Sequence, residues 1–271
     1  MIKPLFLIGC GKMGGAMLAG WVKSRFIDDG IYVVEPNEEA TRTFEGIPNL
    51  TIVRHVSEIR ENIVPSVVIL AVKPQTMDET LPDLKRLIGK ETTFLSVAAG
   101  KTLRYFEKHL SQHAQIVRAM PNTPAAVMRG ITVYVPNGNV PKQQAGVCGE
   151  LLSSVGESVS IDDEGLMDAV TAVSGSGPAY VFLVIEAMAK AGIMSGLPPE
   201  LAMRLARATV SGSGELARLS EETADQLRIN VTSPGGTTAA ALNVLMSDDG
   251  IQPIFDEAIK AAAKRSKELA G

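Results

Sequence analysis

Residues 5–14 read Leu5-Phe6-Leu7-Ile8-Gly9-Cys10-Gly11-Lys12-Met13-Gly14, a short apolar run that ends in three spaced glycines. A continuous apolar run of this length is typical of a buried parallel strand. The following residues, from Ala16 to Val22, are apolar at helical spacing. Strand, glycine turn and helix in this order predict a dinucleotide-binding unit, in which a pyrophosphate lies at the helix N-terminus.

A second apolar run, Ile31 to Val34, ends in Glu35, about 20 residues beyond Gly14, where a dinucleotide-binding fold places the group that meets the adenosine ribose. A carboxylate accepts hydrogen bonds from ribose hydroxyls but repels a 2′-phosphate, and the only arginine close in sequence is Arg42. We therefore expect NADH or NADPH as cofactor, with NADH preferred. NADPH is the alternative, because Asn37 or a shift of the loop could accommodate its 2′-phosphate.

Strand-like and helix-like segments continue to alternate along the first part of the chain. Further apolar runs occur at 50–53, 67–72, 93–97, 116–117 and 131–135. This alternation predicts a mostly parallel sheet, whose ligands bind at the carboxyl ends of the strands. We therefore expect Lys73-Pro74 and Ala99-Gly100, which follow two of these runs, to edge the cofactor crevice.

After Asp162 the strand signals stop, and the rest of the chain reads almost entirely as helix. We therefore predict two domains, a dinucleotide-binding domain over residues 1–162 and a helical domain over 163–271. The segment from Pro178 to Met194 is apolar on nearly all sides, which predicts a buried helix. Because one small helical domain offers little cover for it, a second subunit is expected to supply the missing surface.

A second motif, Ser233-Pro234-Gly235-Gly236-Thr237-Thr238, precedes the helix-forming run Ala239 to Leu242. A Ser cap with Pro in the first turn is a good helix start, and two glycines leave the backbone bare. Free N–H groups and the helix dipole then predict a site for a carboxylate or phosphate, in the interior of the helical domain. The alternative is a glycine-rich turn with an ordinary cap.

Composition excludes several classes of protein. With 45% apolar and 21% charged residues and a mean hydropathy of +0.14, the chain is typical of a soluble globular protein. A net charge of -4 without a basic cluster argues against nucleic acid, and the two cysteines and three histidines lack metal-ligand spacing. The first apolar run ends at Gly9, and no apolar span is long enough for a bilayer, so we expect a cytoplasmic protein.

Taken together, five motifs resemble the pyrroline-5-carboxylate reductase family along essentially the whole chain. They are Gly9–Gly14, Ala71–Pro74, Met120–Pro124, Ser174–Tyr180 and Asn230–Thr238. The resemblance implies reduction of 1-pyrroline-5-carboxylate to L-proline by hydride transfer from NAD(P)H, the last step of proline biosynthesis. It also implies an α/β fold, with an N-terminal Rossmann domain followed by an all-α domain that forms a homodimer, in some members gathered into a larger ring.

The resemblance also assigns site residues. It places cofactor contacts at Gly9, Cys10, Gly11, Lys12, Met13, Gly14, Glu35, Asn37, Ala71, Val72, Lys73, Pro74, Ala99 and Asn230. The substrate carboxylate would be held by backbone N–H groups of Gly236, Thr237 and Thr238, near Ser233, with Glu164 beside the ring. The family commonly carries Ser or Thr where this chain has Glu35. This departure from the family pattern bears on the use of NADPH and not on the reaction.

The chemistry of a cyclic imine fits these residues. Once protonated at nitrogen, an imine is a strong hydride acceptor, so the reaction needs a positioned cofactor and a hydrogen-bonding group more than a strong acid. The Thr238 hydroxyl can donate or accept, and we expect it to be the catalytic group.

Two alternatives remain at this stage. A β-hydroxyacid dehydrogenase would use a lysine in a helix, with an asparagine four residues later, as general acid or base. Lys190 is the lysine inside the long apolar helix, but the residue four positions later is Met194. A non-enzymatic dinucleotide sensor would use the glycine-rich helix entry only for packing.

Overall fold

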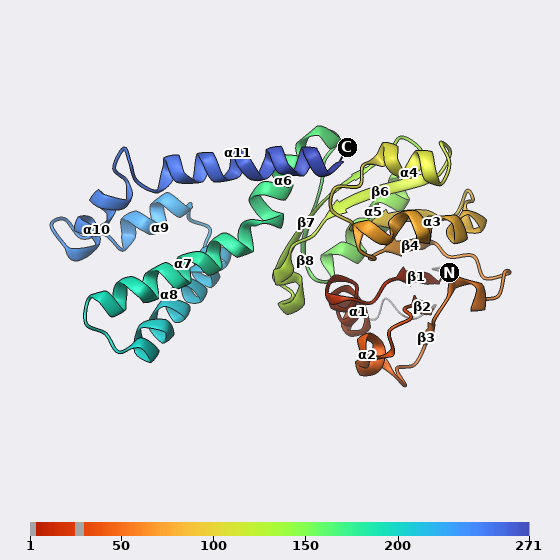
Figure 1. Cartoon of the computed structure of the whole chain (residues 1–271), viewed down its shortest axis with the longest axis horizontal. Helices are drawn as coiled ribbons and strands as arrows, with labels where there is room; N and C mark the ends of the chain where they lie inside the picture. The colour runs from red at the N-terminus through yellow and green to blue at the C-terminus, as the bar shows by residue number, and fades with distance from the viewer. Residues whose placement is uncertain (1–3, 25–29, 271) are drawn as a thin grey trace. The chain divides into compact units, whose positions relative to one another are not determined.

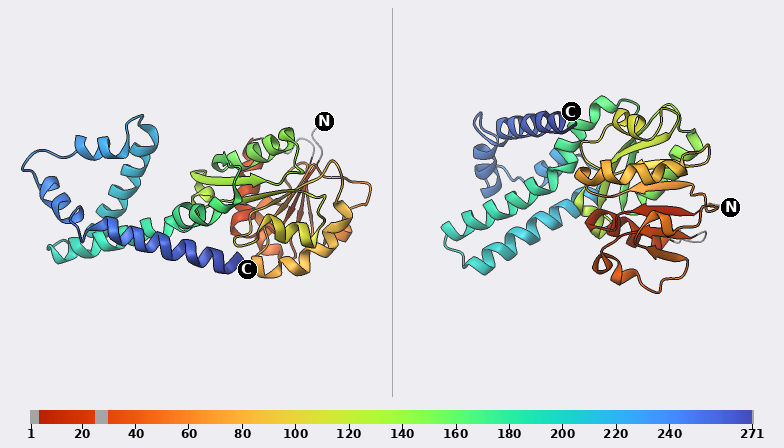
Figure 2. Two further views of the ribbon diagram at one scale, coloured as in Figure 1. Left: turned by 90° about the horizontal axis from the view of Figure 1, so that it is seen from above. Right: turned by 45° about the vertical axis from the view of Figure 1, so that its right-hand side comes forward.

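The computed structural model describes residues 4–24 and 30–270 and divides into two compact units (Figures 1 and 2). The first unit comprises the residues up to Gly175 together with those from Ala263 onward. The second unit is Ser176–Ala262. Residues 1–3, which precede the first apolar run, lie outside the described residues.

The described residues of the first unit form an eight-stranded sheet in the order β3-β2-β1-β4-β5-β6-β7-β8. All neighbouring strands are parallel except β6 and β7, because the short 3-10 segment η5 (Thr123–Val127) between them leaves no room for a crossover helix. This confirms the predicted mostly parallel sheet. The strands are β1 (Leu5–Ile8), β2 (Ile31–Val34), β3 (Leu50–Val53), β4 (Val67–Leu70), β5 (Thr93–Ser96), β6 (Gln115–Met120), β7 (Gly130–Pro136) and β8 (Gly156–Ser160).

Helices cover both faces of this sheet, which explains why its central strands are apolar throughout. In β1, Leu5 and Leu7 pack into one core with Trp21 of α1, while Phe6 and Ile8 pack into the core on the other face. Trp21 Nε1 donates to the carbonyl of Leu151 in α5 at 2.9 Å. The helices are α1 (Lys12–Ser24), α2 (Glu38–Thr41), α3 (Met77–Leu84), α4 (Leu103–His109), α5 (Lys142–Ser153) and α6 (Met167–Val170).

The second unit is helical and has almost no core of its own. Its helices are α7 (Gly177–Met194), α8 (Pro199–Leu219), α9 (Ala224–Asn230), α10 (Thr237–Leu245) and most of α11 (Ile251–Ala270). Small residues, Ala189 of α7 with Ala202 and Ala206 of α8, are its buried apolar side chains. Phe182 and Leu183 of α7 are 58% and 61% exposed, so a single chain does not bury the apolar helix that the sequence predicts to be buried.

A π-helical turn, η7 (Thr171–Gly175), precedes α7, and the carbonyl near its end has a partner outside the helix. Pro178 has no N–H, so the carbonyl of Ser174 loses its usual helical donor. Asn122 Nδ2 donates to that carbonyl instead, at 3.2 Å. The helical path after β8 starts at Glu164, within the first unit, which extends to Gly175. The sequence pattern changes earlier, at Asp162. The domain bounds of 1–162 and 163–271 stay a prediction.

Among the described residues, the helical path Glu164–Met194 is 31 residues long. By length and composition alone, it is long and apolar enough to cross a membrane. This corrects the expectation that no span reaches that length. Gly and Ser residues interrupt the apolar run in the sequence, but the helical path continues through them in the structure.

The end of α11 returns to the first unit. Ser266, which is buried, donates to Asp168 Oδ1 of α6 at 2.6 Å. Gly100, in the loop after β5, has a positive φ of 74°, and a Cβ there would lie 3.2 Å from the Leu269 carbonyl oxygen. The last turn of α11 therefore lies directly against the loop that follows β5.

Candidate active site

The glycine turn between β1 and α1 is too tight for a side chain at two of its three glycines, Gly9 and Gly14. Gly9 has a φ of +94°, which favours glycine. A Cβ on Gly14 would overlap the carbonyl oxygen of Gly9, so α1 can begin directly at the end of β1. The first N–H groups of α1 have no acceptor within the helix and carry the positive end of its dipole. A bare backbone at a helix N-terminus fits a pyrophosphate.

A cleft of about 700 Å³ adjoins this turn at the carboxyl ends of β1, β2 and β4. Several of the residues that the sequence assigns to the cofactor line it together: Gly9, Gly11, Glu35, Asn37, Ala71, Val72 and Lys73. Cys10, Lys12, Met13 and Gly14 belong to the same glycine turn and first turn of α1. Pro74 begins the 3-10 turn after β4, and Ala99 lies in the loop after the neighbouring strand β5.

Glu35 ties the glycine turn to the end of β2. One carboxylate oxygen, Oε2, accepts from the Cys10 N–H at 2.7 Å, and Oε1 accepts from the Asn37 N–H at 3.0 Å. Burial and the nearby Glu35 carboxylate raise the pKa of the Cys10 thiol to about 11, so the thiol is protonated and uncharged at neutral pH. The negative charge at this end of the cleft therefore comes from Glu35 and not from Cys10.

The structure adds Arg54 and His55 to this cleft, which sequence reasoning missed. Both follow β3, and the Arg54 guanidinium donates to Glu38 at the start of α2. Arg42, the arginine that the sequence suggested, is not among the residues that line the cleft. The signal was hidden because only the strand order β3-β2-β1 brings the end of β3 beside Glu35.

The Ser233–Thr238 motif forms a turn followed by a helix, with a later start than predicted. The Gly236 N–H donates to the Ser233 carbonyl at 3.0 Å, which closes a turn around Pro234 and Gly235. Gly235 has a φ of +71°, which a helix cannot contain, so α10 begins at Thr237 with Gly236 as its N-cap. This corrects the prediction that Ser233 caps the helix.

Two consequences follow for the predicted carboxylate site. The N–H of Gly236 is already used within the turn, whereas those of Thr237 and Thr238 are first-turn groups with no helical acceptor. Ser233 and Thr237 are exposed, so the turn lies at the surface of a single chain and not in the interior as expected. The turn is exposed because the helical unit of a single chain has almost no core that could enclose it.

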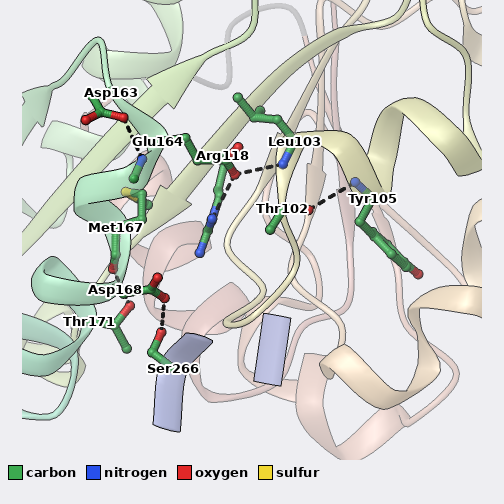
Figure 3. Close-up of polar contacts among 11 residues, drawn as sticks. Thr102, Leu103, Tyr105, Arg118, Asp163, Glu164, Met167, Asp168, Thr171 and Ser266 are labelled. Atoms are coloured by element: carbon green, nitrogen blue, oxygen red, sulfur yellow. Dashed lines mark hydrogen bonds and ion pairs between the residues drawn. The ribbon is translucent and has the colours of Figure 1, made fainter. Parts of the chain in front are cut away.

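The last two predicted site residues are engaged within their own units. Glu164, in the first unit, accepts at Oε1 from the Leu103 N–H and from Arg118 Nη1, at 2.8 and 2.7 Å (Figure 3). Asn230, at the end of α9 in the second unit, accepts from Gln226 Nε2 and donates to Glu222, at 2.8 and 2.9 Å. Within the described residues, no three His, Cys, Asp or Glu side chains gather as a metal-binding group would.

Comparison with known proteins yields two family matches. Residues 164–269 match the family described as pyrroline-5-carboxylate reductase dimerisation, and residues 5–100 match NADP oxidoreductase, coenzyme F420-dependent. A pyrroline-5-carboxylate reductase from Synechocystis sp. is 40% identical, with 99% of each chain covered.

Solved structures show the same similarity. A pyrroline-5-carboxylate reductase from Coxiella burnetii has a TM-score of 0.92 at 34% identity, with 100% of both chains covered. The pyrroline carboxylate reductase of Plasmodium falciparum, solved with NADP bound, has a TM-score of 0.81 at 29% identity, with 100% of this chain and 98% of its own covered. The similarity therefore extends over both units.

Proposed function

This chain belongs to the pyrroline-5-carboxylate reductase family and reduces 1-pyrroline-5-carboxylate to L-proline with NAD(P)H, and we propose that two helix N-termini bind the two reactants. The start of α1 holds the dinucleotide, and the start of α10 holds the substrate carboxylate. The observation that carries the proposal is the turn before α10, where Gly235 and Gly236 add no side chain beside the first-turn amides of Thr237, which is exposed, and Thr238, which is half-buried.

On the cofactor side, the bare turn of Gly9, Gly11 and Gly14 lets the pyrophosphate approach the main chain. Glu35 and Asn37 meet the adenosine ribose at the end of β2. Bound NAD(P)H supplies the hydride. The remaining proposed contacts are Cys10, Lys12, Met13, Ala71, Val72, Lys73, Pro74, Ala99 and Asn230.

On the substrate side, the N–H groups of Thr237 and Thr238 hold the carboxylate, and the positive end of the α10 dipole stabilises its charge. Ser233 and Gly236 complete the turn around it. The Thr238 hydroxyl hydrogen-bonds to the ring nitrogen in either protonation state, which orients the C=N carbon. Glu164 lies beside the ring. Hydride transfer requires this ring to meet the nicotinamide.

The helical part matches a dimerisation domain, and the chain forms a homo-oligomer through it. We propose a cytoplasmic homodimer, in which a second copy covers the exposed apolar side chains of α7. A ring of such dimers is the larger alternative. The same cover explains how a helix apolar enough for a membrane belongs to a soluble protein. Light scattering at micromolar concentration tests the size of the assembly, and a monomer would contradict it.

One paired assay tests the proposed function. NADH oxidation is followed with 1-pyrroline-5-carboxylate, and NAD⁺ reduction is followed with a β-hydroxyacid. We expect turnover only with the imine. Turnover with the hydroxyacid would support a hydroxyacid dehydrogenase, and no turnover with either in folded protein would support a dinucleotide sensor.

Glu35→Gln is expected to shift the cofactor preference toward NADPH. The amide keeps the size of the side chain but removes the charge that repels a 2′-phosphate, so the ratio of kcat/KM for NADPH to that for NADH should rise about tenfold. Arg54, in the same cleft, then faces the phosphate without an opposing carboxylate at position 35. Steady-state kinetics with both dinucleotides measure this ratio.

The matched control is Glu45→Gln, which removes an exposed carboxylate that does not line the cleft. It should leave the ratio unchanged. An unchanged ratio in Glu35→Gln as well would remove Glu35 from cofactor selection.

A further inference from the structure

Arg118 is a buried arginine on β6 that pairs, within the part of the chain that the structure describes, with one carboxylate. Its side chain is only 7% exposed, and its Nη1 lies 2.7 Å from Oε1 of Glu164, whose side chain is 28% exposed. A buried guanidinium is costly unless an anion neutralises it, so its position depends on this carboxylate. In turn, the carboxylate is held by a group that cannot lose its charge.

The same carboxylate oxygen also binds the start of α4. The Leu103 N–H donates to Glu164 Oε1 at 2.8 Å, just after Thr102, which caps that helix by accepting from the Tyr105 N–H (Figure 3). On the other side, Asp163 caps the 3-10 turn η6 (Glu164–Leu166) by accepting from the Gly165 N–H at 2.8 Å. The backbone of Glu164 is thus fixed by its own cap and its side chain by two donors.

This arrangement leaves one oxygen of the carboxylate for another partner. Both donors converge on Oε1, and within the described residues Oε2 makes no hydrogen bond. A carboxylate whose Oε1 is fixed presents Oε2 in one direction, as a positioned acceptor for an N–H group. A protonated ring nitrogen is such a group.

Arg118 also connects the segments that bear on the reaction. It lies on β6 two residues before Met120, whose strand ends at the Met120–Pro124 loop. Leu103 follows the loop that contains Ala99 and Gly100. The Arg118 and Glu164 pair therefore joins the ends of β5 and β6 to the segment that leads into α7.

We propose that Arg118 is a positioning residue for imine reduction, which acts by fixing the Glu164 carboxylate beside the substrate ring. The inference rests on the proposed place of Glu164 at the ring and adds the group that orients it. Arg118 does not touch the substrate. Its planar guanidinium sets the direction of the carboxylate, and a lysine, with a flexible point charge, keeps the charge but not that direction.

The test compares Arg118→Lys, Arg118→Met, Glu164→Gln and the double variant Arg118→Lys with Glu164→Gln. We expect Arg118→Lys and Glu164→Gln each to raise the KM for the imine about tenfold, with the KM for NADH changed less than twofold. Calorimetric affinity for proline should fall to a similar extent. Arg118→Met should show a larger loss than Arg118→Lys, because it removes the charge as well. The double variant should be no worse than the more damaged single variant, because both act through one carboxylate.

Arg86→Met is the matched control. Arg86 Nη2 donates to the carbonyls of Val56 and Ile59 at 2.7 and 3.4 Å, so its removal also costs hydrogen bonds of a guanidinium in the first unit. It should lower the Tm without changing the KM for the imine. A KM shift in Arg118→Lys without one in Arg86→Met supports positioning and not general destabilisation.

Three results would overturn the inference. If Glu164→Gln raises the KM but Arg118→Lys only lowers the Tm, Arg118 is structural and Glu164 keeps its proposed place. If neither variant changes the KM or proline affinity, Glu164 does not lie at the ring, while the reaction and the α10 site stand. If the two effects multiply in the double variant, Arg118 does not act through Glu164.

Discussion

Thr238→Ala is expected to lower the turnover of 1-pyrroline-5-carboxylate about 10- to 100-fold, the scale of a lost positioned hydrogen bond. Thr238 is the second residue of α10, where its backbone N–H has no helical acceptor and its hydroxyl is the group proposed for the ring nitrogen. Alanine keeps the backbone amide that holds the carboxylate and removes only the hydroxyl. The loss should therefore appear in kcat.

Dinucleotide affinity should stay nearly unchanged in Thr238→Ala, as measured by quenching or enhancement of NADH fluorescence. Thr238→Ser is the control, because it keeps a hydroxyl on the same backbone position. It should retain most of the turnover. Wild-type kcat in Thr238→Ala would remove the hydroxyl from the reaction.

Gly14→Ala is expected to weaken NADH binding about 100-fold or more, because the bare turn is what brings the pyrophosphate to the amides of α1. The added methyl group would overlap the Gly9 carbonyl oxygen and also lie 3.2 Å from the Ala71 side chain. Both neighbours belong to the proposed cofactor site, so any shift that relieves the overlap moves that site. Fluorescence titration with NADH gives the affinity, and a thermal melt reports the accompanying loss of stability.

The neighbouring Gly15→Ala is the matched control. A Cβ on Gly15 would meet the Cys10 carbonyl oxygen at 3.5 Å, an ordinary contact. Since alanine is also the better helix former, NADH affinity should be kept and the Tm should not fall. Equal, wild-type affinity in both variants would show that the closeness of Gly14 to Gly9 is not needed for the dinucleotide.

The first half of the fold could be predicted from sequence because its signals are local. The run from Leu5 to Gly14 contains strand, turn and helix start within ten consecutive positions, and Glu35 stands at a fixed distance from it. Strand β8 was missed, because Gly156–Ser160 is polar and lies at the edge of the sheet, where an apolar pattern is not required. The other edge strand, β3, also has no buried residue but has the mostly apolar sequence Leu50-Thr51-Ile52-Val53, so it could be recognised.

Other parts depend on contacts between distant residues. Arg54 reaches the cofactor cleft through the order of strands, and Arg118 meets Glu164 across 46 positions of sequence. The start of α10 was misplaced for a local reason, since Pro234 and Gly235 suit the centre of a turn as well as the start of a helix. The apolar pattern of α7 predicts a buried helix, but a single chain leaves large apolar side chains of α7 exposed.

The central claim is that the first amides of α10 hold the carboxylate of the reacting ring. A crystal structure of the protein with proline and NAD⁺ tests it most directly. We predict the proline carboxylate about 3 Å from the N–H groups of Thr237 and Thr238, with the ring nitrogen at the Thr238 hydroxyl. A proline molecule bound elsewhere, with nothing at the Ser233–Thr238 turn, would contradict the account.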